Sequence, residues 1–390
     1  MDQNLLILNT MSRNGNSLIF QLLYDHPKIC FFPARIKIAC ADPVGWPFID
    51  FVDQNIEQFF NQIIKKTTIP HNLNHDTEWH NIKIELIENI NSKIFGNIKL
   101  NFLNRTKKYG EIVNRSNLKI FINLYIESVI SSLSEKNNYN FYKSKYTLIL
   151  DDHAYNLGTE DFKLIYADAH FLQIVRNSKD ILASRKNMLL FHNKFIGDPS
   201  TKKLKDEVLI SELRRTIWNF VAAYLNYNQN KNKYHLIKFE NLRGHERKKI
   251  MTELSSKLKI NYTNSLLNET KERNTFYGNE LLFADSSLKK ISGGRSSKKI
   301  NSYKVTLNDS ENRVIDTFIK KFSGYFPENL NHDDLIPELK SYYENNLDNV
   351  MRDKVLSNFF KLYKEARYKE LFIEYSKLNY GGSRANNSFE

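Results

Sequence analysis

Short apolar runs alternate along the chain with longer stretches in which apolar residues recur every three or four positions. The short runs favour strands, and the longer spacing favours helices. The predicted strands are residues 5–8, 29–32, 146–150, 170–175 and 234–242. Alternating strands and helices are typical of an α/β fold. Its open, mainly parallel sheet is flanked by helices and binds ligands at the carboxyl ends of the strands.

Helical spacing dominates residues 50–140, where few convincing strands are found. The apolar positions predict helices over residues 52–64, 82–94 and 118–133. We interpret this region as a helical insertion over the sheet, which acts either as a substrate-binding lid or as a structural layer. A long amphipathic helix is expected over residues 206–227, with a stripe formed by Leu209, Leu213, Ile217, Phe220 and Tyr224.

Residues 1–330 are expected to form one α/β domain that contains this insertion. Residues 331–380 are predicted to be a C-terminal helical segment of unassigned role, and residues 381–390 a disordered tail. The two cysteines, Cys30 and Cys40, give no disulfide framework. Neither a basic leader nor a long apolar span is found, so we expect a cytoplasmic protein without a transmembrane segment.

The charge balance indicates an anionic ligand. The 57 lysines and arginines exceed the 44 acidic residues, which gives a formal charge of +13. Nucleic acid would also suit this charge. However, the chain has no aromatic stretch typical of RNA-recognition motifs, no Cys/His finger spacing and no basic tail. A nucleic-acid partner is therefore disfavoured.

The first candidate anion site follows the first predicted strand. A turn around Gly15 joins that strand to a helical pattern, so several backbone N–H groups meet at the start of a helix. Arg13 adds a formal charge and Ser17 a hydroxyl group. The predicted contacts are Ser12, Arg13, Asn14, Gly15, Asn16, Ser17 and Leu18.

The second candidate anion site lies at residues 171–184. It is again an apolar strand that leads into a helix start, with Arg176 at the junction and Ser184 two turns further on. Asp180 falls in the first turn of the expected helix, where a carboxylate favours the positive end of the dipole.

The ordered pair of motifs resembles the sulfotransferases that use 3'-phosphoadenosine 5'-phosphosulfate (PAPS). The loop of that family resembles [K/R]-S-G-T-T, and Asn14 and Asn16 depart from its Ser and Thr. Its second motif resembles R-N/D-x-K/R-D-x-x-x-S, which residues 176–184 match without a gap. The resemblance covers about two thirds of the chain. It implies that the loop holds the 5'-phosphosulfate, that Arg176 and Ser184 hold the 3'-phosphate, and that no metal is needed.

Competing nucleotide motifs are missing from the same turn. A Walker A loop requires Gly-Lys-Ser/Thr, but Gly15 is followed by Asn16. A G-x-G-x-x-G run is also missing, which disfavours a Mg²⁺-dependent triphosphatase and a Rossmann site. An ordinary polar turn between strand and helix is the structural alternative.

Two later segments add candidate contacts. Residues 289–299 combine lysines with Gly293, Gly294 and Arg295, and such a backbone can form an anion-binding nest. Their position resembles the family's flexible segment over the 3'-phosphate, although a solvated loop is the plain alternative. Residues 234–242 resemble the family's Y-E-D-L element. This resemblance places Phe239 near the adenosine, and a core aromatic is the alternative.

The candidate base follows the strand at residues 146–150, which ends in Asp151-Asp152-His153. Many members of the resembled family carry the general base, a histidine, at the equivalent place. His153 suits that role because its ordinary pKa lies near neutrality. Asp152 is the alternative base, and a metal site is a further possibility without evident partner ligands. Arg13 would stabilise the leaving phosphate oxygen.

The resemblance predicts the reaction and the donor, with 3'-phosphoadenosine 5'-phosphate (PAP) as its product, but not the acceptor. The Arg-type loop followed by Asp25-His26-Pro27 resembles carbohydrate-directed members, so a sugar hydroxyl is the first choice. An alcohol on a lipid or secondary metabolite comes next. A non-catalytic nucleotide-binding protein is the hypothesis of a different class.

Overall fold

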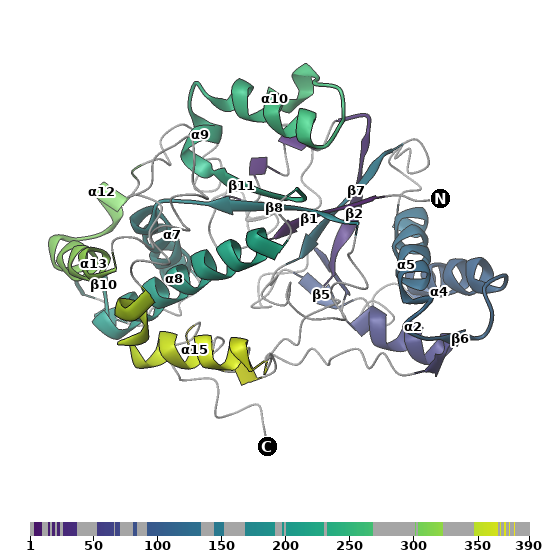
Figure 1. Ribbon diagram of the computed structural model, residues 1–390, viewed down its shortest axis with the longest axis horizontal. Helices are drawn as coiled ribbons and strands as arrows, with labels where there is room; N and C mark the ends of the chain where they lie inside the picture. Colours follow the sequence, from purple (N-terminus) through teal and green to yellow (C-terminus); the bar gives the residue numbers. More distant parts are fainter. Residues whose placement is uncertain are drawn as a thin grey trace.

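We describe a computed structural model of the chain (Figure 1). The residues that the structure describes are 4–9, 15, 18–19, 22–23, 26–36, 53–65, 67–70, 81–83, 92–133, 144–151, 168–191, 197–198, 200–229, 232–267, 301, 303–322, 347–365, 367, 370–371, 374 and 378.

A seven-stranded sheet in the order β11-β8-β1-β7-β2-β4-β5 forms the centre of the molecule. Neighbouring strands from β11 to β2 are parallel, and β4 and β5 extend the sheet antiparallel at one edge. This confirms the predicted α/β class and its mainly parallel sheet. The strands are β1 (Asn4–Asn9), β2 (Ile29–Ile36), β4 (Thr67–Pro70), β5 (Asn81–Lys83), β7 (Tyr146–Asp151), β8 (His170–Val175) and β11 (Tyr234–Lys238).

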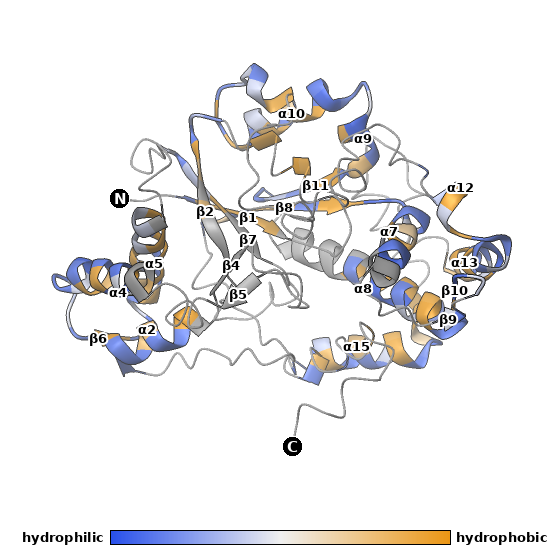
Figure 2. Cartoon of the chain, turned by 180° about the vertical axis from the view of Figure 1, so that it is seen from behind, coloured by the Kyte–Doolittle hydropathy of each residue, from blue (hydrophilic) through white to orange (hydrophobic). Residues whose placement is uncertain are grey.

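The central strands are buried on both faces because alternate side chains enter different cores. Leu5 and Ile7 of β1 pack into one cluster, whereas Leu6 and Leu8 pack into another. Helices α9 (Phe239–Arg243) and α10 (Arg247–Lys257) lie on one side of the sheet, and α5 (Leu118–Leu133) lies on the other (Figure 1). The outer turns of α10 are hydrophilic, whereas β1 and β11 carry hydrophobic residues (Figure 2).

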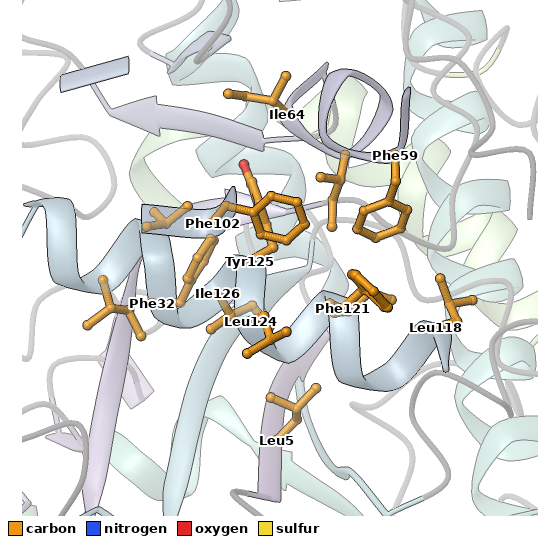
Figure 3. Close-up of a cluster of buried hydrophobic side chains, with 14 of the residues drawn as sticks. Leu5, Phe32, Phe59, Ile64, Phe102, Leu118, Phe121, Leu124, Tyr125 and Ile126 are labelled. Atoms are coloured by element: carbon orange, nitrogen blue, oxygen red, sulfur yellow. The ribbon is translucent and has the colours of Figure 1, made fainter. Parts of the chain in front are cut away.

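The first core joins the sheet to the helices of the predicted insertion, α2 (Ile56–Lys65), α4 (Ser92–Thr106) and α5. Its aromatic rings lie between these helices (Figure 3). The ring centroids of Phe60 and Phe102 are 5.4 Å apart. The prediction for residues 118–133 is confirmed as α5. The described helices of this region form a structural layer, and a lid role stays a prediction.

The predicted helix at residues 82–94 is wrong at its start, because residues 81–83 form strand β5, which pairs with β4. Residues 92–94 are helical, as predicted, and belong to the longer helix α4, whereas residues 84–91 lie outside the described residues. Strands β4 and β5 also contradict the expectation of few strands in this region. The β-branched residues Thr67, Thr68 and Ile69 favour extended backbone, and pairing with β4 satisfies the backbone groups on one side of β5. A short pair, β3 (Gln54–Asn55) and β6 (Ile112–Val113), lies beside α2.

A separate core joins α7 (Ser178–Phe191), α8 (Asp206–Gln229), α13 (Asp309–Lys321) and α15 (Lys354–Lys364). Leu209, Leu213 and Ile217 of the predicted stripe are fully buried in it. The Trp218 ring contacts Phe360 of α15 at 5.6 Å between centroids. The remaining elements are β9 (Gly197–Asp198), β10 (Lys203–Leu204), the 3-10 helix η3 (Asn264–Leu267) and α12 (Tyr303–Thr306).

The described carboxyl ends of four strands lie within two residues of one another along the sheet. Asn9 of β1 is in register with Asp151 of β7 and with Gln173 of β8, and Lys238 of β11 is in register with Val175. The segments that follow β1, β7, β8 and β11 therefore start at one edge of the sheet. Among the described helices, none is long and apolar enough to cross a membrane.

A histidine pair lies toward the opposite edge, near the starts of β8 and β11. The distance from His170 Nδ1 to His235 Nε2 is 3.1 Å, and the two rings are stacked. Burial lowers the pKa of both rings, and that of His235 falls to about 3, with the charges of His170 and Lys257 adding to the effect. Both imidazoles are therefore neutral at neutral pH.

Acid should destabilise the protein through this pair. The pKa of His235 in the folded state lies below its unfolded value of about 6.5, so its contribution to stability is present above pH 6.5 and is lost toward pH 3. The free energy of unfolding in urea should fall by on the order of 1 kcal/mol per pH unit over this window. His235→Gln should flatten that dependence, whereas His245→Gln, on an exposed residue, should not. An equal pH slope in the wild type and His235→Gln would contradict this role.

Candidate functional site

The turn after β1 is built around Gly15. The φ angle of Gly15 is +96°, in the left-handed region that favours glycine. Its carbonyl accepts a hydrogen bond from the N–H of Leu18 at 2.9 Å, where the helical backbone starts. The side chain of Leu18 is buried in the core, so only its backbone is suited to a ligand contact. The other predicted loop residues, Ser12, Arg13, Asn14, Asn16 and Ser17, lie outside the described residues.

Phe239 packs directly against this turn. A Cβ atom added to Gly15 would lie 2.2 Å from a ring carbon of Phe239, far inside van der Waals contact. Glycine is therefore required here both by the backbone conformation and by the aromatic ring. The structure brings two of the predicted site residues together from β1 and from the end of β11.

Arg176, the third predicted site residue at this place, follows the last residue of β8. Its side chain is buried, and its guanidinium carbon lies 4.5 Å from the centroid of the Phe239 ring. Burial lowers the pKa of Arg176, while the carboxylates of Asp180 and Glu240 favour its charged form. The Phe239 ring thus packs against the Gly15 turn and lies close to the buried guanidinium of Arg176.

Asn177 starts helix α7 beside this cation. Its side-chain oxygen accepts hydrogen bonds from the backbone N–H groups of Lys179 and Asp180, at 3.0 and 3.3 Å. This is an N-cap, which explains an Asn directly after the Arg in the motif. Ser184 lies half-buried on the same helix. The positive end of α7 therefore lies next to Arg176, as the strand–helix junction predicts.

Lys179 and Asp180 have a role that the sequence did not indicate. The carboxylate of Asp180 accepts hydrogen bonds from the backbone N–H groups of Asn301 at 2.9 Å and Tyr303 at 3.2 Å. Lys179 Nζ lies 2.6 Å from the carboxylate of Asp316. The motif thus joins the first turn of α7 to the start of α12 through Asp180 and to α13 through Lys179. Gly293, Gly294 and Arg295 lie outside the described residues.

The predicted strand at residues 234–242 is wrong in its second half. Strand β11 ends at Lys238, level with the end of β8, and Phe239 starts the short helix α9. Glu240 of this helix accepts a hydrogen bond from the N–H of Asn177 at 2.9 Å. Because β8 offers no further partner beyond Val175, the chain turns into a helix that packs Phe239 and Glu240 against the Arg176-Asn177 junction.

The candidate base lies just beyond a described strand end. β7 ends at Asp151, in register with Asn9 of β1, and both Asp152 and His153 lie outside the described residues. Within the described ranges, no group of three or more His, Cys, Asp or Glu side chains could hold a metal ion.

His26, of the Asp25-His26-Pro27 sequence, has a structural role. Its ring is buried, with Nε2 2.8 Å from the carbonyl oxygen of Asn261, and Nδ1 accepts a hydrogen bond from the N–H of Lys28 at 3.1 Å. Burial lowers the pKa of His26. This neutral ring joins the turn before β2 to the segment after α10.

Comparisons find sulfotransferases among solved structures, with low similarity. A sulfotransferase domain from the curacin biosynthetic pathway is 12% identical, with a TM-score of 0.44 over 81% of this chain and 97% of that domain. A sulfotransferase domain from the Synechococcus olefin synthase is 12% identical, with a TM-score of 0.36 over 81% and 95%. A sulfotransferase from Mycobacterium avium is 9% identical, with a TM-score of 0.34 over 82% and 76%. No family model and no curated protein matches the chain.

At these scores the similarity does not establish a shared family, so function is inferred from the chain's own residues. The described site combines a glycine turn, a buried arginine and a helix N-terminus at the carboxyl edge of a parallel sheet. Such a combination is chemically suited to an anionic ligand.

The contact between Gly15 and Phe239 can be tested by a mutant cycle. Gly15→Ala should lower the free energy of unfolding by at least about 1–2 kcal/mol, because a left-handed alanine costs that much before any clash with the ring. In a Phe239→Leu background the loss should be smaller, because the ring that Cβ meets is gone. Urea unfolding of the four proteins measures this, and strictly additive losses would contradict the contact.

Proposed function

We propose that this protein is a sulfotransferase that moves the sulfuryl group of PAPS to an acceptor hydroxyl. The observation that carries the proposal is the Arg176 junction. A buried guanidinium lies over the ring that packs on the Gly15 turn, beside the N-terminus of α7. The two segments that we propose to bind phosphate are far apart in the sequence, and the Phe239 side chain contacts both.

The 3'-phosphate would lie on the β8 side of this site. Arg176 follows β8 directly, and Ser184 lies on the helix after it. A buried guanidinium with a lowered pKa is poorly hydrated, so a phosphate gains a strong charge-assisted hydrogen bond there. Phe239 stays the predicted neighbour of the adenosine, and Gly293, Gly294 and Arg295 stay predicted contacts of the 3'-phosphate.

The 5'-phosphosulfate would lie at the turn between β1 and its helix. The left-handed Gly15 and the adjacent helix start suit a chain that presents backbone N–H groups to an anion. Arg13 is the proposed cation at the leaving phosphate oxygen, where charge develops during transfer. When bound, PAPS supplies the activated sulfuryl group, so the protein has to position it and accept a proton.

The proton of the acceptor hydroxyl is assigned to His153, with Asp152 as the alternative base. Both residues follow Asp151 at the end of β7, and that strand end is level with the end of β1. The base and the turn that carries Arg13 therefore leave neighbouring strands at the same edge of the sheet. A sugar hydroxyl is the proposed acceptor, and a mass-spectrometric acceptor screen in the presence of PAPS would identify it.

Donor binding tests this function directly. PAP should bind in the presence of a chelator and more tightly than ATP, because the site has an arginine–serine pair and no Walker lysine. Arg176→Ala should weaken PAP binding by roughly tenfold or more, since it removes a charge-assisted hydrogen bond. Isothermal titration calorimetry measures both. ATP binding that equals or exceeds PAP binding would refute the proposed donor.

The base is tested by two substitutions. His153→Ala should leave PAP affinity unchanged and lower turnover by roughly 10²–10⁴, the usual contribution of a positioned base. The acidic limb of the pH–rate profile should disappear with it. An active His153→Ala enzyme together with an inactive Asp152→Asn enzyme would instead assign the base to Asp152.

A further inference from the structure

A second arginine lies close to the Phe239 ring, which Arg176 also contacts. Arg243, in the last turn of α9, has its guanidinium carbon 5.8 Å from the centroid of the Phe239 ring, compared with 4.5 Å for Arg176. Arg243 is half-buried. The Phe239 ring thus has two cations close to it and packs against the Gly15 turn.

The two guanidinium groups repel each other. The charge of Arg243 contributes to the lowered pKa of Arg176. Asp180 and Glu240 offset part of this repulsion, but their carboxylates also accept backbone hydrogen bonds, Asp180 from Asn301 and Tyr303 and Glu240 from Asn177. An anion that contacts both arginines would relieve the repulsion, because like charges at short range in a low-dielectric site are unfavourable.

The strand order of the sheet indicates which phosphate group of the proposed donor would contact both arginines. β1 and β7 are neighbours, and the segments that follow them carry the proposed transfer chemistry. Arg176 follows β8 on the other side of β1, and Arg243 lies in the helix that follows β11, the next strand outward. Arg243 therefore lies on the side of the site farther from the transfer, where the 3'-phosphate is proposed to lie.

We propose that Arg243 binds the 3'-phosphate together with Arg176 and determines specificity for a 3'-phosphorylated donor. This inference rests on the proposed function. A phosphate monoester carries up to two negative charges near neutral pH, so a second guanidinium completes the neutralisation that Arg176 starts. The role of Arg243 is binding and not chemistry, because it lies away from the strands that carry the transfer.

The test compares two ligands within each variant. PAP and adenosine 5'-phosphate (AMP) differ only by the 3'-phosphate, so the ratio of their dissociation constants reports that group alone. A partial loss of folded protein does not change this ratio. Arg243→Gln should lower the preference for PAP over AMP by roughly tenfold or more, the effect of one charge-assisted hydrogen bond. Arg243→Lys should retain part of the preference because it keeps the charge without the planar fork.

The matched control is Arg313→Gln on α13, an exposed arginine whose loss changes the net charge equally and should leave the ratio unchanged. If the wild type does not prefer PAP over AMP, both the proposed function and this inference fail. If the wild type prefers PAP and Arg243→Gln keeps that preference, or weakens PAP and AMP equally, only the inference about Arg243 is overturned.

Discussion

The contact between the Phe239 ring and Gly15 determines the geometry of the candidate site. The ring comes from the end of β11, the glycine from the turn after β1, and Arg176 lies over the ring from the end of β8. One side chain therefore links the segments that follow β1, β8 and β11, three strands that parallel pairing already holds side by side. A Cβ atom at position 15 would lie 2.2 Å from the ring, and the φ angle of +96° also favours glycine, so two separate constraints require glycine in this turn.

The hydrogen bonds around this contact link the site to the helices behind it. Glu240 binds the N–H of Asn177, Asn177 caps α7, and Asp180 binds the backbone of Asn301 and Tyr303. The Asp180 carboxylate thus holds the start of α12 by its backbone, whereas the Glu240 carboxylate of α9 holds the N-terminus of α7 through the N–H of Asn177. Asn177 and Asp180 of the motif therefore have defined structural uses, Asn177 as the cap of α7 and Asp180 as the hydrogen-bond acceptor for the start of α12.

The sequence was sufficient to predict an element where the local hydrophobic pattern matched the tertiary environment of that element. Residues 170–175 and 118–133 form the predicted strand and helix because their apolar residues suit a buried strand and a core-facing helix. Arg176 was found because it stands at a strand–helix junction. The end of β11 was missed because the apolar residues Phe239 and Leu242 continue the strand pattern, and only the end of β8 stops the pairing. Glu240 and Arg243 were missed for the same reason, since their roles depend on the helix that the pattern did not predict. Likewise, the partners of Asp180 lie far along the chain, where no local spacing reveals them.

The position of β1 in the sheet has a consequence for synthesis on the ribosome. β1 is the first strand of the chain, yet it lies between β7 and β8, which start at Tyr146 and His170. Strand β1 therefore cannot pair on both sides until β8 has left the exit tunnel. Until then, the strand neighbours of β1 are missing. Contacts so distant in sequence slow folding and leave nascent chains prone to aggregation. The helical layer built from α2, α4 and α5 is completed earlier and presents the core that residues Leu5 and Ile7 join. Assembly of the centre of this protein is thus a late event, even though its central strand is made first.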